Sequence, residues 1–228
     1  MEDTIQSVER SFELIDALLE LDGAGVTELA EHLNISASGT YKHLTTLREL
    51  GYLEKRDGTY EVSYELFSFG ARVRRREPLY EVGREPLDQL ARVTYTRTNL
   101  YVRERQHAVC LYSTFGGQDG STESTEGRAI ALEDSAVGRV MRSHGENRDV
   151  PREWADGPES GLTVVDDHQV GIETEDERRR IAVEIGGSDR VRGSIEVLAP
   201  IDQIEGRLVD EDILSMMVST AETIESRL

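Results

Sequence analysis

The sequence predicts an α+β protein with an N-terminal winged helix-turn-helix, a linker helix, and a C-terminal domain of strands and helices. Three observations predict this class. Two short amphipathic helices are separated by a turn, a hairpin signal follows them directly, and alternating strands framed by helices come later. The 228 residues are enough for two modest domains with separate cores. We place the boundaries at residues 1–63, 64–77 and 78–228.

The first domain is expected to open with a helix over residues 4–21 and to continue with two shorter helices. Val26–Leu33 and Ala37–Leu50 each carry one apolar stripe at the helical period. Asn34 stands at the turn between them, where its tolerance of the left-handed conformation is useful. Ser36 is a good N-cap for the second helix.

The hairpin is predicted at Gly51–Val62, because Asp57-Gly58 is flanked by strand-forming residues. The chain has two lysines; Lys42 falls on the second helix and Lys55 on the hairpin, the two elements that touch DNA in such a module. No acidic residue occurs from residue 36 to 48, although the net charge is −19. We therefore predict double-stranded DNA as a partner. The predicted contacts are Ser36, Ser38, Thr40, Tyr41, Lys42, His43, Lys55 and Arg56.

This segment is similar to a known family. The segment over residues 8–70, with the landmarks "SVERSFELIDAL" (which begins at residue 7), "TELAEHLNIS", "GTYKHLTTLRELGYLEK" and "YEVSYELFSFG", resembles the N-terminal domain of IclR-type transcriptional regulators in order and spacing. The family usually has Arg where this chain has Lys42. The resemblance implies a transcriptional regulator, a repressor or an activator. We expect a homodimer or a higher homo-oligomer that reads a palindromic operator, because Phe12, Leu66 and Phe69 in the opening and linker helices are more apolar than a lone three-helix module needs.

The acidic composition suggests a salt-loving host and also makes DNA binding harder to explain. Acidic residues number 45 against 26 Lys and Arg, a balance typical of proteins from salt-loving archaea; an acidic regulator from another source stays an alternative. Such a chain repels DNA at long range, and phosphate attraction weakens as salt rises. We infer that base contacts and shape carry more of the affinity than usual. The chain has no long apolar run and no basic-then-apolar leader, so a cytoplasmic location without a membrane is expected.

The second domain is predicted from three helical and five strand segments, with the helices on one side of the sheet. Helices are expected over residues 85–94, with Pro86 at the start, 135–144, capped by Ser135, and 210–228. Strands are expected at residues 98–104, 107–114, 129–132, 179–186 and 191–200. Residues 115–127 read as a flexible loop. This order resembles the GAF-like ligand-binding half of the same family. The stretch "LEDSAVGRV" of this chain partly matches the family's helix motif at that place.

A small-molecule site is predicted from polar and aromatic residues that alternate on the strands. We expect the loop at residues 115–127 to close over it and the ligand to be a small anionic metabolite, because Arg128 can pair bidentately with a carboxylate. Balancing nearby Glu126 and Glu133 is an alternative role for Arg128. The predicted ligand contacts are Asn99, Tyr101, Cys110, Tyr112, Arg128 and Ser135.

Catalytic and metal chemistry have little support in the sequence. The five histidines are scattered, no HExxH or paired-cysteine spacing occurs, and Cys110 lies mid-strand. We therefore predict no enzyme, no metal and no cofactor. Two alternatives stay open for the C-terminal domain: it senses a small metabolite, or it binds none and mediates self-assembly or partner binding.

Overall fold

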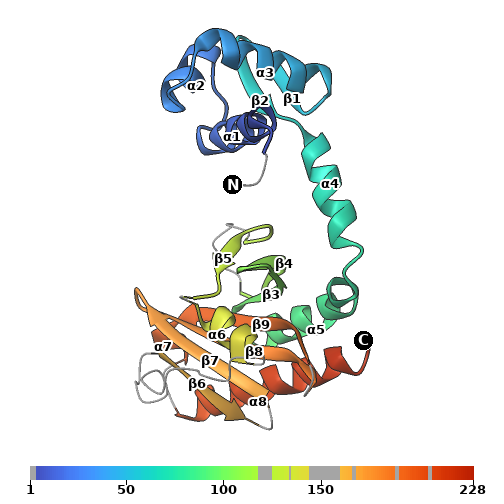
Figure 1. Ribbon diagram of the computed structural model, residues 1–228. Coiled ribbons are helices and arrows are strands. Elements are labelled where there is room, and N and C mark those ends of the chain that lie inside the picture. The colour runs from blue at the N-terminus through green and yellow to red at the C-terminus, as the bar shows by residue number, and fades with distance from the viewer. Residues whose placement is uncertain are drawn as a thin grey trace. The chain divides into compact units, whose positions relative to one another are not determined.

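The structure of the protein is a computed structural model, and it describes residues 4–117, 125–133, 135–143, 160–165, 168–187, 190–204 and 207–228. The chain forms two compact units, Met1–Arg74 and Arg75–Leu228 (Figure 1). Each unit has its own hydrophobic core. No helix among the described residues is both long and apolar enough to cross a membrane.

The first unit is a winged helix-turn-helix. Its elements are α1 (Gln6–Glu20), α2 (Val26–His32), α3 (Ala37–Glu49), β1 (Leu53–Arg56), β2 (Thr59–Val62) and α4 (Tyr64–Arg74). Leucines from α1, α2 and α3 pack at its centre around Tyr60 of the wing, which is fully buried. The wing is thereby anchored to the same core as the helices.

The local signals in this unit are confirmed. Asn34 has φ 52° in the turn, and Asp57 and Gly58 have φ 50° and 92° in the hairpin. Ser36 caps α3, with its side chain accepting a hydrogen bond from the Gly39 amide. The predicted helix-turn-helix and wing therefore form where short-range chemistry places them.

The second unit is built on a seven-stranded antiparallel sheet of order β5-β4-β3-β9-β8-β7-β6. Its strands are β3 (Arg97–Glu104), β4 (His107–Phe115), β5 (Ala129–Ala131), β6 (Ser160–Val165), β7 (His168–Glu175), β8 (Arg178–Gly187) and β9 (Arg190–Pro200). Its helices are α5 (Pro78–Thr94), α6 (Ala136–Ser143), α7 (Ile201–Ile204) and α8 (Arg207–Glu225). The central strands β9 and β8 come from the end of the chain, so the sheet is completed late in the sequence.

Both faces of this sheet are covered, which corrects the expectation of helices on one side. The larger core lies between the sheet and helices α5 and α8. The smaller core lies under α6, on the opposite face (Figure 1). Alternation along β8 shows the division: Ile181 and Val183 join the larger core, and Ala182 joins the smaller one.

Several element boundaries differ from the prediction. Pro86 is buried inside α5, and the proline in the first turn is Pro78, next to the capping residue Glu77. Strands β6 and β7 were not predicted, because their sequence is polar or Gly-containing and lacks a long apolar run. α4 ends at Arg74 and α8 begins at Arg207, so both lie a few residues from the expected ends.

Candidate functional site

The outward face of α3 is the candidate nucleic-acid surface. Leu44 and Leu47 turn one side of the helix into the core. With 3.6 residues per turn, the opposite side carries Ser38, Tyr41 and Lys42. All three are exposed, and Tyr41 exposes 53% of its surface although it is aromatic. This face presents a hydroxyl, a phenol and an ammonium group without a carboxylate in its first two turns.

The wing adds a second cation. The Lys55 Nζ atom lies 4.7 Å above the ring centre of Tyr60 and 3.3 Å from its hydroxyl oxygen. Because Tyr60 is fixed in the core, this contact positions the ammonium group on the wing. Arg56 is different: its guanidinium lies 2.5 Å from Glu54 and 3.8 Å from Glu61, which raises its pKa and neutralises its charge locally.

Thr40 does not share the outward face, and this corrects its assignment as a contact. Thr40 is fully buried and its hydroxyl donates to the Ser36 carbonyl oxygen at 3.1 Å. His43 is half-buried, and its Nδ1 atom lies 3.0 Å from the Ser11 hydroxyl of α1. Both positions follow from the helical period, which carries these residues towards the core and towards α1.

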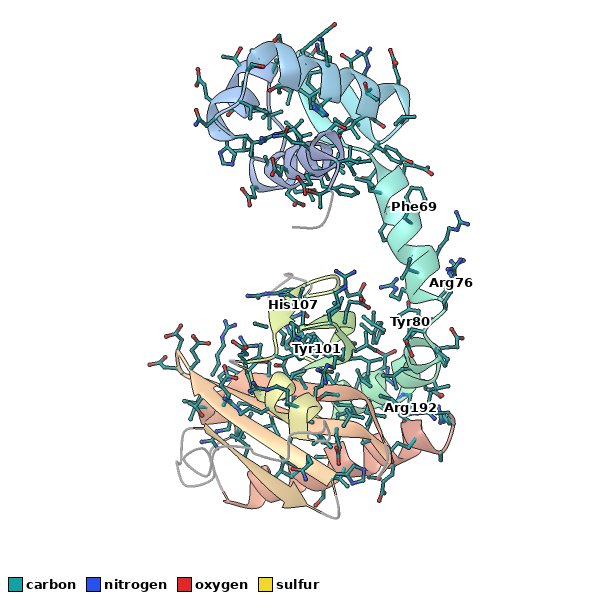
Figure 2. All side chains as sticks on the ribbon, in the orientation of Figure 1. Phe69, Arg76, Tyr80, Tyr101, His107 and Arg192 are labelled. Atoms are coloured by element: carbon teal, nitrogen blue, oxygen red, sulfur yellow. The ribbon has the colours of Figure 1, made fainter. Side chains whose placement is uncertain are left out.

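A groove of about 700 Å³ lies in the first unit between α1, α3 and α4. Its walls are mostly apolar, and several wall residues are exposed: Val8 at 50%, Phe12 at 62%, Leu50 at 61% and Phe69 at 42%. α4 contains no buried residue at all. Phe69, labelled on α4 in Figure 2, packs on Tyr52 with ring centres 6.0 Å apart. Such an exposed apolar surface on a small domain is typical of an interaction site.

The second unit has a pocket of about 300 Å³ on the α6 side of the sheet. Its lining combines hydroxyl groups with charges of both signs. The polar and charged lining residues are Tyr101, Thr125, Arg128, Ser135, Glu173, Glu175, Arg180 and Glu196.

Glu196 of β9 is the most buried charged residue of this pocket, at 1% exposure. Its Oε2 atom accepts hydrogen bonds from the Asn99 amide at 2.8 Å and from the Tyr101 hydroxyl at 3.4 Å. Its Oε1 atom lies 3.5 Å from the Arg180 guanidinium. Burial raises the pKa of Glu196, and Arg180 and Asn99 oppose this shift. Burial likewise raises the pKa of Tyr101.

Glu173 occupies the N-terminus of α6. Its Oε2 atom accepts a hydrogen bond from the Ala136 amide at 2.7 Å and lies 3.3 Å from the Arg139 guanidinium. Ser135 caps the same helix end, accepting from the Gly138 amide at 3.0 Å and donating to the Ala131 carbonyl oxygen. The predicted cap is confirmed, and the positive end of this helix is already neutralised by a side chain.

Three of the six predicted ligand contacts, Tyr101, Arg128 and Ser135, line the pocket. Asn99 and Cys110 lie on the same face of the sheet, where the Thr125 hydroxyl donates to the Asn99 oxygen and lies 3.6 Å from the Cys110 sulfur. Burial raises the pKa of the Cys110 thiol to about 11, so the thiol is poorly suited to act as a nucleophile.

Tyr112 lies on the opposite face, which corrects its assignment. The register between β3 and β4 shifts after Leu100, so Tyr112 pairs with Leu100 and Cys110 pairs with Tyr101. This bulge at Leu111 breaks the two-residue alternation on which the prediction relied. The Tyr112 hydroxyl donates to Asp88 of α5 at 2.8 Å, and its ring packs edge-on against Tyr80.

Four charged residues of the pocket were not among the predicted ligand contacts: Glu173, Glu175, Arg180 and Glu196. A signal existed for Glu196, which stands between Ile195 and Val197 in an apolar strand. The predicted closing loop falls largely on residues 118–124, outside the described residues. Within the described part of the chain, no cluster of three or more His, Cys, Asp and Glu side chains suits a metal ion.

Comparisons with known proteins agree with this arrangement. Residues 7–57 match the IclR helix-turn-helix domain. The chain is 27% identical over 247 residues to "Probable HTH-type transcriptional regulator ArcR" of Halobacterium salinarum, covering 98% of this chain and 94% of that protein.

Two solved structures share the fold. The IclR structure from Thermotoga maritima superposes with a TM-score of 0.74 at 18% identity, over 99% of each chain. An IclR homolog from Microbacterium hydrocarbonoxydans, complexed with 4-hydroxybenzoate, gives 0.70 at 16% identity, covering 96% of this chain and 98% of that one. At these identities the likeness concerns the fold.

Proposed function

We propose that the chain is an IclR-type transcriptional regulator that reads a palindromic operator as a homodimer, and that its affinity for DNA responds to a small metabolite. The observation that carries this proposal is the outward face of α3, where Ser38, Tyr41 and Lys42 are exposed. In a helix-turn-helix the second helix enters the major groove with its N-terminal residues at the base edges. Lys55 on the wing is the matching phosphate contact.

The groove between α1, α3 and α4 supports dimerisation. A twofold operator requires two copies of the reading helix, and the exposed apolar residues of α1 and α4 belong to the same unit as that helix. A second copy of this chain would cover Phe12, Leu66 and Phe69. We assign the groove to the dimer contact for this reason.

The pocket beside α6 supports metabolite sensing. Its volume of about 300 Å³ lies at the lower end of small-molecule sites, and its walls offer donors and acceptors that can fix a ligand's orientation. A fold neighbour was solved with 4-hydroxybenzoate, so this architecture accommodates small ligands. The competing proposal is a C-terminal domain that binds no small metabolite and mediates self-assembly or partner binding. The pocket does not support that proposal.

Recovery of bound genomic DNA tests the regulatory function. The native protein would be crosslinked and immunoprecipitated from its host, and the bound fragments sequenced. We expect an inverted repeat whose half-sites lie about one helical turn apart, upstream of a small number of genes. Fragments without a shared inverted repeat would contradict the proposal.

A further inference from the structure

We propose that the pocket beside α6 binds a small zwitterion, with its ammonium group at Glu196 and its carboxylate towards Arg128. This inference rests on the proposed metabolite sensing and names the chemical class of the ligand. It replaces the anionic metabolite expected from the sequence, which considered Arg128 without the carboxylates that the fold brings around it.

Glu196 is the buried carboxylate of the pocket lining, and it lies beside Arg180, which lines the same pocket. Glu196 is 1% exposed and lines the pocket, yet its Oε1 atom has a single ionic contact, Arg180 at the long distance of 3.5 Å. A buried carboxylate is stabilised by a second donor with a positive charge. Burial raises the pKa of this group, and an ammonium ligand would favour its charged form again.

The place where an anion would ordinarily bind is already filled. The N-terminus of a helix attracts carboxylates through its free amides and dipole. At α6 the Glu173 carboxylate takes that position, 2.7 Å from the Ala136 amide, and it is further held by Arg139. A ligand carboxylate beside these groups would meet Glu173 and Glu196, two groups of its own charge, and Arg180 is already paired with Glu196.

Arg128 provides a separate place for a carboxylate. Its side chain is exposed and lines the pocket. A guanidinium on the exposed lining and a carboxylate on the buried lining match the two ends of an amino acid.

The test uses ligands that differ by one group at a time. Thermal unfolding of the full-length protein in molar KCl would be followed with the standard amino acids and with ω-amino acids of two to five carbons. For every amino acid that raises Tm, the acid without its amine and the amine without its carboxylate are tested as well. Sugar acids and aromatic acids form a separate arm.

We expect at least one zwitterion to raise Tm in proportion to its concentration, and its matched acid and amine to act about tenfold more weakly in Kd. Glu196→Gln and Arg128→Gln should each raise the Kd of that zwitterion about tenfold or more by calorimetry. Glu104→Gln, an exposed change on the same strand as Tyr101, should leave it unchanged. Because Arg128 is exposed, its variant keeps the test informative if the Glu196 variant folds poorly.

The arms separate two failures. If acids without an amine shift Tm and zwitterions do not, the inference is wrong and metabolite sensing stands. If no compound of any arm shifts Tm, both the inference and the proposed sensing are contradicted. Equal affinity of the zwitterion for wild type and Glu196→Gln also overturns the inference.

Discussion

Glu196 is held in a sheet interior that disfavours its charge. The folded state raises the pKa of this carboxyl, so it binds a proton more tightly than the unfolded chain does. At pH values below the pKa of Glu196 in the unfolded chain, Glu196 is protonated in both states and does not lower the free energy of unfolding. As pH rises through the pKa of Glu196 in the folded protein, Glu196 must carry its charge in the buried site, and the free energy of unfolding falls.

Glu196→Gln should therefore stabilise the ligand-free protein at high pH more than at low pH. The gain in unfolding free energy should be measurable near pH 8 and should shrink or vanish near pH 4. Denaturant unfolding of both proteins across this range, in molar KCl, measures the difference. A gain that is largest at acid pH would contradict the assigned cause.

Thr40 was predicted to contact DNA, whereas the structure shows it fully buried. Thr40→Val removes its buried hydroxyl bond to Ser36 at nearly constant volume. We expect the unfolding free energy to fall by about 1 kcal/mol, while the affinity of the folded protein for DNA stays within twofold. Unfolding and gel-shift titrations on the same preparation test this. A selective loss of DNA binding would restore Thr40 to the contact surface.

At the scale of elements, the sequence predicts what short-range chemistry determines. The turn at Asn34, the cap at Ser36 and the hairpin at Asp57-Gly58 each depend on one to four neighbouring residues, and all three are confirmed. The pocket depends on strand register instead. Arg180 and Glu196 meet because β8 and β9 pair, and no local pattern indicates that contact.

The bulge in β4 is the clearest instance of this limit. Alternation placed Cys110 and Tyr112 on one face, whereas one extra residue between them turns Tyr112 towards α5. Tyr112→Phe removes the bond to Asp88, which should lower the unfolding free energy by about 1 kcal/mol.

The same variant should bind any pocket ligand as wild type does, because Tyr112 lies across the sheet from the pocket. Tyr101→Phe is the matched comparison, since it removes a hydroxyl that lines the pocket. Calorimetric titration of both variants with a pocket ligand shows which of the two tyrosines lies on the face of the sheet that holds the pocket. A weaker ligand affinity in Tyr112→Phe would contradict the register.

At the scale of the whole molecule, net charge makes dimerisation important. A chain of charge −19 repels DNA, and each copy offers one lysine on α3 and one on the wing. Joining two copies doubles these contacts and fixes their spacing. The apolar groove then has a clear use in the assembly.

Phe69→Glu should shift the protein from dimer to monomer at micromolar concentration. A buried carboxylate in an apolar contact costs about 2–4 kcal/mol, which raises the dimer Kd at least about thirtyfold. Tyr64→Glu is the control: Tyr64 lies on the same helix, is 88% exposed and does not line the groove. Light scattering in molar KCl reports the mass. A wild-type monomer, or equal behaviour of both variants, would refute the groove as dimer contact.

The central claim is that the outward face of α3 reads DNA. Its most direct test is a gel-shift titration of an immunoprecipitated operator duplex with wild type, Lys42→Ala, Tyr41→Ala and Arg10→Ala. Arg10→Ala removes a positive charge as Lys42→Ala does, but from α1, where Arg10 pairs with Glu13. We expect the two α3 variants to lose about 1–3 kcal/mol per half-site while remaining folded, and Arg10→Ala to bind within threefold of wild type. Unchanged affinity in both α3 variants, or an equal loss in Arg10→Ala, would contradict the account.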